Sequence, residues 1–366
     1  MNFSKRILDW HAKFGRVGLP WQNQKDPYRV WLSEIMLQQT QVATVRERYP
    51  LFLKKFPNVR ALANATEDEV MAEWAGMGYY TRARNLWRCA KAVVSDCGGQ
   101  FPRTAAQLQL LPGIGKSTAA AIAAFCFDER SAILDGNVKR VLARVFRVEE
   151  PINEVKTEKK MWAIAESLVP KKTSEMPAYT QAMMDFGATA CTRSKPICIE
   201  SSPSQRKCVM ADVCLAYQAG VVLDLPAKKQ KKTSPKLQSE LLLLMTPTEV
   251  LLERRPSKGI WGGLWTLPET KWATADGKLN VELTDYPQLR ILENQDEIAR
   301  LYVKAKHLAP IKHVFSHRIL NFYPKVLKFR SKPVIQVNNQ LRWVKFSELA
   351  SIGLPKPVKD LLLSFS

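Results

Sequence analysis

The feature that most constrains the fold is a change of sequence pattern near residue 223. Residues 1–222 read as helices separated by turns, whereas residues 239–366 hold short apolar and aromatic runs before a final helical stretch near 357–365. Between them, residues 223–238 contain five lysines and two prolines without an apolar period, which is typical of a linker. The sequence therefore predicts a mainly α domain followed by a smaller α+β domain, each long enough for its own core.

Apolar spacing and capping residues, among them a capping box at Thr66–Glu69 and a cap at Thr104, predict the elements of each domain. Helices are expected over 28–56, 66–76, 82–95, 104–111, 116–125, 138–146 and 156–168. Strands are expected at 241–245, 249–253, 301–306, 317–329 and 341–346.

The chain is strongly basic. It has 366 residues, with 55 Lys and Arg against 34 Asp and Glu, which gives a formal net charge of +21. This excess favours a polyanionic partner, first of all nucleic-acid phosphates, over a merely basic protein. No apolar run reaches the roughly 20 residues that span a bilayer, and the N-terminus lacks a signal-peptide core. We therefore expect no membrane partner, a cytoplasmic location and, without an oligomerisation signal, a monomer.

The stretch LPGIGKSTA (111–119) lies between two helical patterns. Gly113 and Gly115 allow positive φ and close backbone approach, so the nearby amides can hold a phosphate without reading base identity. This spacing is a helix-hairpin-helix signature, and the spacing of a P-loop is absent. A plain turn between helices is the alternative, which the basic charge disfavours.

Cysteine and histidine are unevenly distributed. Four of the seven cysteines fall within residues 191–214, and such a cluster in a reducing compartment indicates metal ligands. No histidine occurs between residues 12 and 306. Acid–base chemistry in that range must therefore use carboxylates.

Several motifs carry a family resemblance. LPGIGKSTAAAI, followed by LDGNVKRVLARVF, resembles the helix-hairpin-helix DNA glycosylases. WLSEIMLQQTQV and CTRSKP narrow this to the adenine DNA glycosylases, the MutY family, which are similar to endonuclease III. The resemblance runs from about Leu19 to Cys214 and resumes after the linker. It implies a helical glycosylase domain with a helix-hairpin-helix at 105–126 and an iron–sulfur loop at 191–214, followed by a Nudix-like domain.

Glu34 and Asp135 are the candidates for acid–base chemistry. Breaking a purine–deoxyribose bond needs an acid for the leaving base and an ionised carboxylate for the developing sugar cation. Glu34 shares a predicted helix face with Gln38 and Gln41, and Asp135 precedes a helix whose dipole favours its ionised form. Alone, Glu34 would equally fit a solvated charge, and Asp135 an N-cap. The resemblance implies that Glu34 protonates adenine at N7 and that Asp135 stabilises or covalently traps the sugar cation. Asn137 would help to orient the site.

Ser117 bears on the type of reaction. The relatives that resemble endonuclease III carry a lysine there, which forms a Schiff base and then cuts the strand. A hydroxyl cannot form an imine, and Lys116 is offset by about 100° around the helix, so it should point elsewhere. We expect a monofunctional, hydrolytic glycosylase. The alternatives are an endonuclease III-like glycosylase/lyase, which Ser117 disfavours, and a non-catalytic DNA-binding scaffold, which the carboxylate pair disfavours.

Chemistry on a base requires that it leave the duplex and that the gap be filled. The resemblance implies that Gln38 and Tyr79 insert beside the lesion and that Gln181 lies near the extruded adenine, whereas Tyr80 is expected in the core. The full set of expected DNA contacts is Gln38, Tyr79, Gly113, Gly115, Lys116 and Gln181.

The cysteine cluster departs from the family spacing in one place. The family binds a [4Fe–4S] cluster through C-x6-C-x2-C-x5-C, and this chain has C-x6-C-x9-C-x5-C. Because a loop must satisfy an end-to-end distance and not a length, the resemblance still implies a [4Fe–4S] cluster. Its ligands are then Cys191, Cys198, Cys208 and Cys214. A four-cysteine zinc site and a metal-free set of thiols are the alternatives.

The second domain opens with LLERRPSKGIWGGLWTLPE, which resembles the start of a Nudix fold. A Nudix hydrolase needs an acidic, metal-binding helix, and the residues after Glu269 do not supply one. The resemblance therefore implies recognition of 8-oxoguanine without hydrolysis. Phe315 would stack or wedge, and Ser316 and His317 would hydrogen-bond the lesion; a simple β-turn is the alternative. The implied partner is double-stranded DNA with adenine opposite 8-oxoguanine or guanine.

Overall fold

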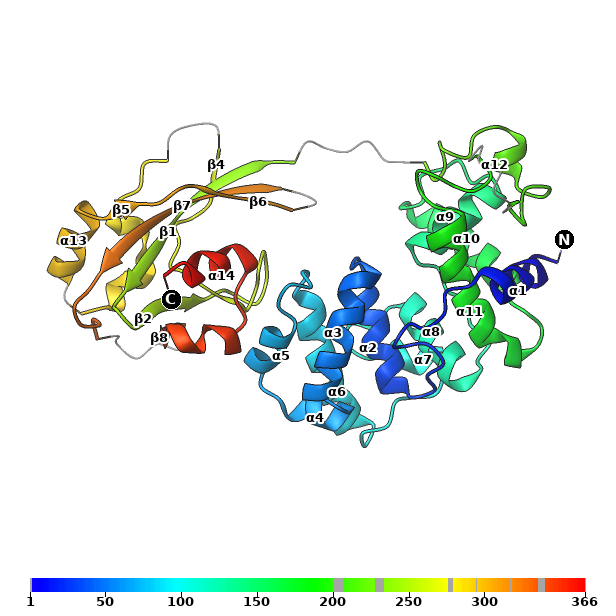
Figure 1. Cartoon of the computed structure of the whole chain (residues 1–366), viewed down its shortest axis with the longest axis horizontal. Helices are drawn as coiled ribbons and strands as arrows, with labels where there is room; N and C mark the ends of the chain where they lie inside the picture. Colours follow the sequence, from blue (N-terminus) through cyan, green and yellow to red (C-terminus); the bar gives the residue numbers. More distant parts are fainter. Residues whose placement is uncertain are drawn as a thin grey trace. The chain divides into compact units, whose positions relative to one another are not determined.

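The computed structural model describes residues 2–199, 207–227, 234–275, 279–293, 295–315, 318–334 and 340–365. The chain divides into two compact units (Figure 1). The helical unit comprises Met1–Asn64 and Asn85–Lys231, and the C-terminal unit comprises Ala65–Arg84 and Lys232–Ser366. By its contacts, the segment Ala65–Arg84 therefore belongs with residues that follow it by more than a hundred positions.

A hydrophobic core cluster in the helical unit contains buried side chains such as Trp10, Val141 and Met183. A run of buried alanines in the helix over 116–127 lets neighbouring helices approach it closely. The elements are α1 (Phe3–Phe14), α2 (Pro27–Leu37), α3 (Val42–Lys55), α4 (Val59–Asn64), α6 (Thr81–Asp96, from Asn85 onward), α7 (Ala105–Leu108), α8 (Lys116–Phe127), α9 (Gly136–Val145), α10 (Val155–Ser167), η1 (Thr173–Glu175), α11 (Met176–Asp185), the π-helix η2 (Phe186–Ala190) and α12 (Leu215–Gln218).

The single helix expected over 28–56 is wrong, because the chain forms two helices there. α2 ends at Leu37 and α3 begins at Val42. Gln39 adopts φ 56°, a left-handed conformation that an α-helix does not contain. Gln38 is consequently the C-cap of α2 and not the next residue of a continuous face. Neither glycine nor proline marks this break in the sequence.

Capping signals located the helix starts well. Thr66 and Glu69 form the expected reciprocal capping box at the start of α5 (Glu67–Glu73). The Thr104 side chain accepts the Gln107 N–H at the start of α7, and Asp135 caps α9. These predictions are confirmed because a cap depends only on residues within one turn.

A mixed sheet forms the centre of the C-terminal unit (Figure 1). Its order is β3-β2-β1-β7-β5, with β8 also on β2, β6 on β7 and β4 on β1. β1 and β7 are parallel and the other pairs are antiparallel. Besides α5, the elements are β1 (Lys236–Met245), β2 (Glu249–Arg254), β3 (Trp265–Thr266), β4 (Ala273–Thr274), η3 (Leu283–Asp285), η4 (Pro287–Ile291), α13 (Gln295–Val303), β5 (Lys306–His307), β6 (Ile311–Val314), β7 (Ile319–Lys328), β8 (Leu341–Lys345), η5 (Phe346–Ser351) and α14 (Lys356–Leu363).

The strand expected at 301–306 is largely wrong. Residues 301–303 belong to α13, and only β5 at Lys306–His307 is extended. Ile298 and Tyr302, four residues apart, are both buried in the core that also holds Leu244 and Leu327. Helical spacing of buried residues therefore prevailed over the strand preference of a Tyr-Val pair.

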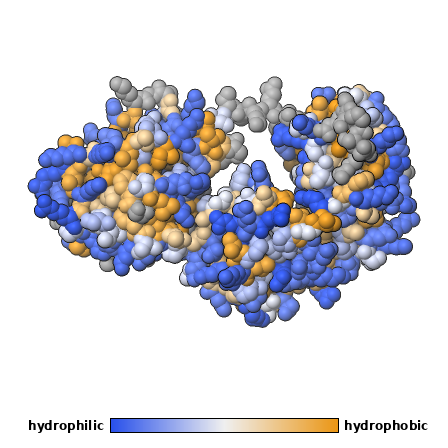
Figure 2. Space-filling view, in the orientation of Figure 1, coloured by the Kyte–Doolittle hydropathy of each residue, from blue (hydrophilic) through white to orange (hydrophobic). Residues whose placement is uncertain are grey.

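The two units differ in the hydropathy of the surface residues on the face shown in Figure 2. On the face shown in Figure 2, hydrophilic residues cover most of the helical unit, and hydrophobic residues are more frequent over the C-terminal unit. Within the described part of the chain, no helix combines the length and the apolar character that crossing a bilayer would require.

Candidate active site

A cavity in the helical unit collects polar residues that are far apart in sequence. Its volume is about 1160 Å³, and α2, α8, α9 and α11 contribute to its wall. The predicted site residues that line it are Glu34, Gln38, Ser117, Asp135, Asn137 and Gln181. The two carboxylates therefore share one cavity.

Glu34 lies in the last turn of α2, between buried Ser33 and Ile35. Burial, and secondarily the neighbouring charge of Asp135, raises the pKa of Glu34 from 4.5 to about 8. The carboxyl group is therefore protonated at neutral pH, since the uncharged form is favoured away from water. This is the property required of a general acid.

Opposing effects act on the pKa of Asp135. Burial raises its pKa, while the N–H groups of Val138 and Asn137 and the positive charge of Arg140 act in the opposite direction. Its Oδ1 accepts the Val138 N–H at 2.7 Å as the N-cap of α9. Burial is the larger effect, so the pKa of Asp135 lies above its usual value. The sequence had indicated the helix dipole but not the opposing burial.

Arg140 is a site residue that the sequence analysis missed. Its Nη2 donates to Asn137 Oδ1 at 2.9 Å and to the Gly187 carbonyl at 2.6 Å, and its Nε donates to the Cys191 carbonyl at 2.9 Å. A Cβ on Gly187 would come within 2.7 Å of the Asn137 Cβ, so this approach needs glycine. Spacing along α9, three residues after Asn137, was the available signal.

A buried carboxylate supports the far wall of the cavity. Asp185 is 0% exposed and accepts hydrogen bonds from Gln181 Nε2 at 2.9 Å and from Arg16 Nε at 2.8 Å. His11 Nε2 lies 3.3 Å from its other oxygen. Burial raises the pKa of Asp185, but the hydrogen bond with His11 and the hydrogen bonds and charge of Arg16 hold it below its usual value. The sequence analysis missed Asp185, Arg16 and His11, although Asp185 follows Gln181 by one helical turn.

The residues that open α8 point in different directions. Ser117 lines the cavity, and its Oγ accepts the Leu134 N–H at 3.0 Å. The Lys116 Nζ instead lies 2.9 Å from Glu166 and 4.0 Å from the centre of the Trp162 ring. The ammonium group is therefore held by neighbours outside the wall of the cavity.

The two glycines of the hairpin serve different purposes. Gly113 has φ +77°, and a Cβ there would lie 2.6 Å from the Asn85 Cβ, so the fold itself requires glycine. Gly115 is the N-cap of α8 at φ −83°, where a Cβ would meet nothing within 4 Å. The open space at Gly115 leaves the backbone accessible to a large ligand.

The four clustered cysteines converge on one small apolar cavity beside α9. Arg144, buried beneath them, donates from Nη1 to the Thr192 carbonyl at 2.6 Å and to Cys191 Sγ at 3.4 Å. Among the described residues, no three His, Cys, Asp or Glu side chains are placed to hold one metal ion. Four thiols around a common space, with a guanidinium to offset their charge, still fit a multi-iron cluster, whose ligands stand farther apart than those of one ion.

Tyr79 and Phe315 belong to the C-terminal unit. Tyr79 is 52% exposed at φ 49°, whereas the adjacent Tyr80 is buried, as predicted. The Phe315 ring lies 4.5 Å, centre to centre, from the His313 ring and 5.6 Å from Trp261. Ser316 and His317 lie outside the described residues. Between 270 and 293, the described segments form only β4 and two short 3-10 helices, so they supply no acidic Nudix helix.

Comparison with known proteins covers both units. Residues 32–167 match the HhH-GPD superfamily of base excision DNA repair proteins, and residues 241–364 match a NUDIX domain. An adenine DNA glycosylase of Buchnera aphidicola (subsp. Baizongia pistaciae) is 36% identical over 98% of this chain and 95% of its own length. The human adenine DNA glycosylase is 31% identical over 98% of this chain and 73% of its own. The solved structure of a thermostable thymine-DNA glycosylase aligns with a TM-score of 0.52 at 30% identity, covering 59% of this chain and 95% of that one.

Proposed function

Because this chain belongs to the adenine DNA glycosylase family, we propose that it removes mispaired adenine from double-stranded DNA by hydrolysing the bond between base and sugar. The observation that carries the proposal is the carboxyl pair in one cavity: burial raises the pKa of Glu34 to about 8, while backbone N–H groups and Arg140 offer partners to an anion at Asp135. DNA as the substrate also accounts for the net charge of +21 and would bring the protein to the nucleoid.

The chemistry follows from the two protonation states. Glu34 gives its proton to N7 of adenine as the C1′–N9 bond breaks, so that the bond's electron pair leaves with a neutral base. The anion of Asp135 stabilises the resulting sugar cation or bonds to it transiently. A water oxygen then joins C1′, and its proton returns to the Glu34 carboxylate. Asn137, held by Arg140, orients the site.

Ser117 supports a reaction without strand cleavage. A lyase needs an amine at C1′, and the Lys116 ammonium is engaged by Glu166 and Trp162. A thymine-DNA glycosylase has a similar structure, so the fold alone does not determine which base is removed. The base specificity proposed here rests on the family relatives and on the polar wall around Gln181 and Asp185.

We expect strand breaks only after alkali when the protein acts on a duplex with one adenine opposite 8-oxoguanine. Borohydride added during the reaction should trap no cross-linked species, because Ser117 carries no amine and the Lys116 ammonium is engaged by Glu166 and Trp162. Gel analysis with and without alkali, with an endonuclease III-type lyase as positive control, measures both. Breaks without alkali, or a cross-link lost in Lys116→Ala, would favour the lyase alternative; no breaks in either arm would favour the scaffold.

DNA contact is proposed for both units. In the helical unit, the hairpin of Gly113, Gly115 and Lys116 would bind the phosphate backbone, Gln38 would enter the duplex, and Gln181 would face the extruded adenine. In the C-terminal unit, exposed Tyr79 would insert beside the opposing base. Phe315, with Ser316 and His317 next to it in the chain, would distinguish 8-oxoguanine from guanine by stacking and hydrogen bonds.

A [4Fe–4S] cluster is the proposed resident group of Cys191, Cys198, Cys208 and Cys214. When bound, the cluster would be held by the four cysteine thiolates and would fix the loop that carries Arg193 and Lys195 for contact with DNA. Arg144 already holds this loop through the carbonyls of Thr192 and Arg193.

Protein purified without oxygen should be brown and contain about four iron atoms per chain. Cys198→Ser should lower the iron content and weaken duplex binding, whereas Cys97→Ser, outside the group, should change neither. Metal analysis and a binding titration check both results. Colourless protein with one zinc per chain would overturn the proposal.

A further inference from the structure

The turn over residues 256–263 packs against β6 and β7, the two strands between which Phe315 lies in the chain. Trp261, in this turn, adopts φ 53° and is 9% exposed. Its ring stacks on Phe322 of β7 with centres 5.4 Å apart and also contacts His313 and Phe315. A left-handed tryptophan costs conformational energy, so its three aromatic neighbours must hold it in place.

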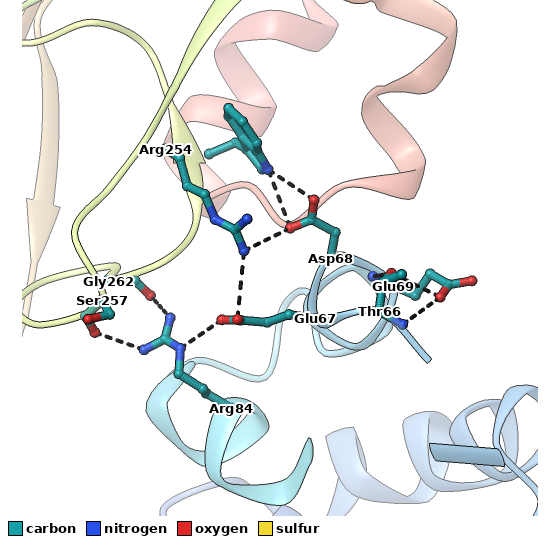
Figure 3. Close-up of polar contacts among 9 residues, drawn as sticks. Thr66, Glu67, Asp68, Glu69, Arg84, Arg254, Ser257 and Gly262 are labelled. Atoms are coloured by element: carbon teal, nitrogen blue, oxygen red, sulfur yellow. Dashed lines mark hydrogen bonds and ion pairs between the residues drawn. The ribbon is translucent and has the colours of Figure 1, made fainter. Parts of the chain in front are cut away.

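The same turn receives Arg84 (Figure 3). Arg84 is 4% exposed, and its Nη1 donates to the Ser257 carbonyl at 2.9 Å while Nη2 donates to the Gly262 carbonyl. Its Nε donates to Glu67 at 2.8 Å. Gly263 has φ +74°, and a Cβ there would collide with the guanidinium. The turn is thus shaped around this one side chain, and removing it would leave the buried Gly262 carbonyl without this donor.

A second set of contacts, also within the C-terminal unit, joins the segment Ala65–Arg84 to residues of the sheet and the chain after it. Arg254 of β2 reaches Glu67 at 3.7 Å and Asp68 at 3.5 Å (Figure 3). The Trp265 indole N–H lies 3.3 Å from Asp68, and the Tyr80 hydroxyl donates to the Leu354 carbonyl at 3.3 Å. The segment Ala65–Arg84 is therefore held to the sheet at several points.

Arg84 lies one helical turn after Tyr80, the residue next to exposed Tyr79. The Arg84 N–H donates to the Tyr80 carbonyl, and the Arg82 N–H donates to that of Tyr79 at 2.8 Å. The Arg82 side chain also donates to the Met77 and Gly78 carbonyls. The backbone of Tyr79 is therefore fixed relative to Arg84, and through Arg84 to the turn that carries Trp261.

We propose that Arg84 and Trp261 are positioning residues that hold Tyr79 and Phe315 in one fixed arrangement and so set the preference for 8-oxoguanine over guanine opposite adenine. This inference rests on the proposed function. Arg84 touches no DNA in this scheme: it acts on Tyr79 through the first turn of α6 and on Phe315 through Trp261.

The test is the ratio of single-turnover adenine excision rates on duplexes with 8-oxoguanine and with guanine opposite the adenine. Both rates come from one protein sample, so the ratio is insensitive to the fraction that is folded. Arg84→Ala and Trp261→Leu should each lower the ratio about tenfold, the size of one specific base contact. Arg84→Lys, which keeps the charge but not the forked geometry, should fall between Arg84→Ala and wild type.

The matched control is Arg88→Ala, an exposed arginine one turn further along α6, which should keep the wild-type ratio. In a double-mutant cycle, Arg84→Ala should add little to Phe315→Ala, because both disturb the same contact. A wild-type ratio in both Arg84→Ala and Trp261→Leu would overturn the inference. A wild-type protein without preference between the duplexes would instead overturn the proposed lesion recognition.

Discussion

Glu34→Gln is expected to lower the single-turnover rate of adenine excision by about 10²- to 10⁴-fold, the contribution of a positioned general acid. Gln keeps the size of the side chain and has no proton to transfer, so duplex affinity should stay close to wild type. Rates from quenched reactions and affinities from a binding titration separate the two effects. Glu47→Gln, an exposed position on α3, is the matched control. A Glu34→Gln rate within threefold of wild type would remove Glu34 from the reaction.

The raised pKa of Glu34 gives this prediction a pH dependence. Since the protonated form of Glu34 acts, the wild-type rate should fall tenfold per pH unit above about pH 8. A separate acid limb is expected where Asp135, whose pKa burial raises, takes up a proton. The sign for stability is also fixed: a folded pKa of about 8 against an ordinary 4.5 means that the folded state binds more protons. The free energy of unfolding therefore falls progressively as the pH rises from 4.5 to about 8, because the unfolded chain releases the Glu34 proton while the folded chain keeps it. Thermal unfolding should show Glu34→Gln more stable than wild type at pH 8, with the difference vanishing below pH 4.5.

Asp135→Asn should lower the excision rate by roughly 10²- to 10³-fold, because a neutral amide cannot stabilise the sugar cation. Asn is as good an N-cap as Asp, so α9 and the thermal midpoint should change little. Since the charge of Asp135 raises the pKa of Glu34, the alkaline limb of the rate profile should also move to lower pH in the variant. Rates across pH and a melting curve check these results.

Asp9→Asn, at an exposed position of α1, serves as the control for Asp135→Asn. Asp135→Ala should lose as much activity as Asp135→Asn and, because it also loses the cap, be less stable by about 1 kcal/mol. If Asp135→Asn kept the wild-type rate while Asp135→Ala did not, the role of Asp135 would be that of a cap alone.

Features that depend on neighbours within one or two turns were readable from the sequence. The capping box at Thr66 and the cap at Asp135 follow from local geometry. The site residues Arg140 and Asp185 were missed although Asn137 and Gln181 lie one turn away on the same helices, because their other partners, Gly187 and Arg16, are brought near only by packing. The break at Gln39 was missed because its left-handed conformation has no local sequence signal.

The sequence by itself determined the family, the succession of a helical and a mixed region, and the residue types of the site, since caps, turns and spacings act over a few residues. Only the tertiary structure decided that positions 34 and 135 share a cavity and that one of them keeps its proton, because burial and charge act between distant segments. It also decided that residues 65–84 pack with the C-terminal sheet, where one buried guanidinium satisfies carbonyls that are distant in the chain.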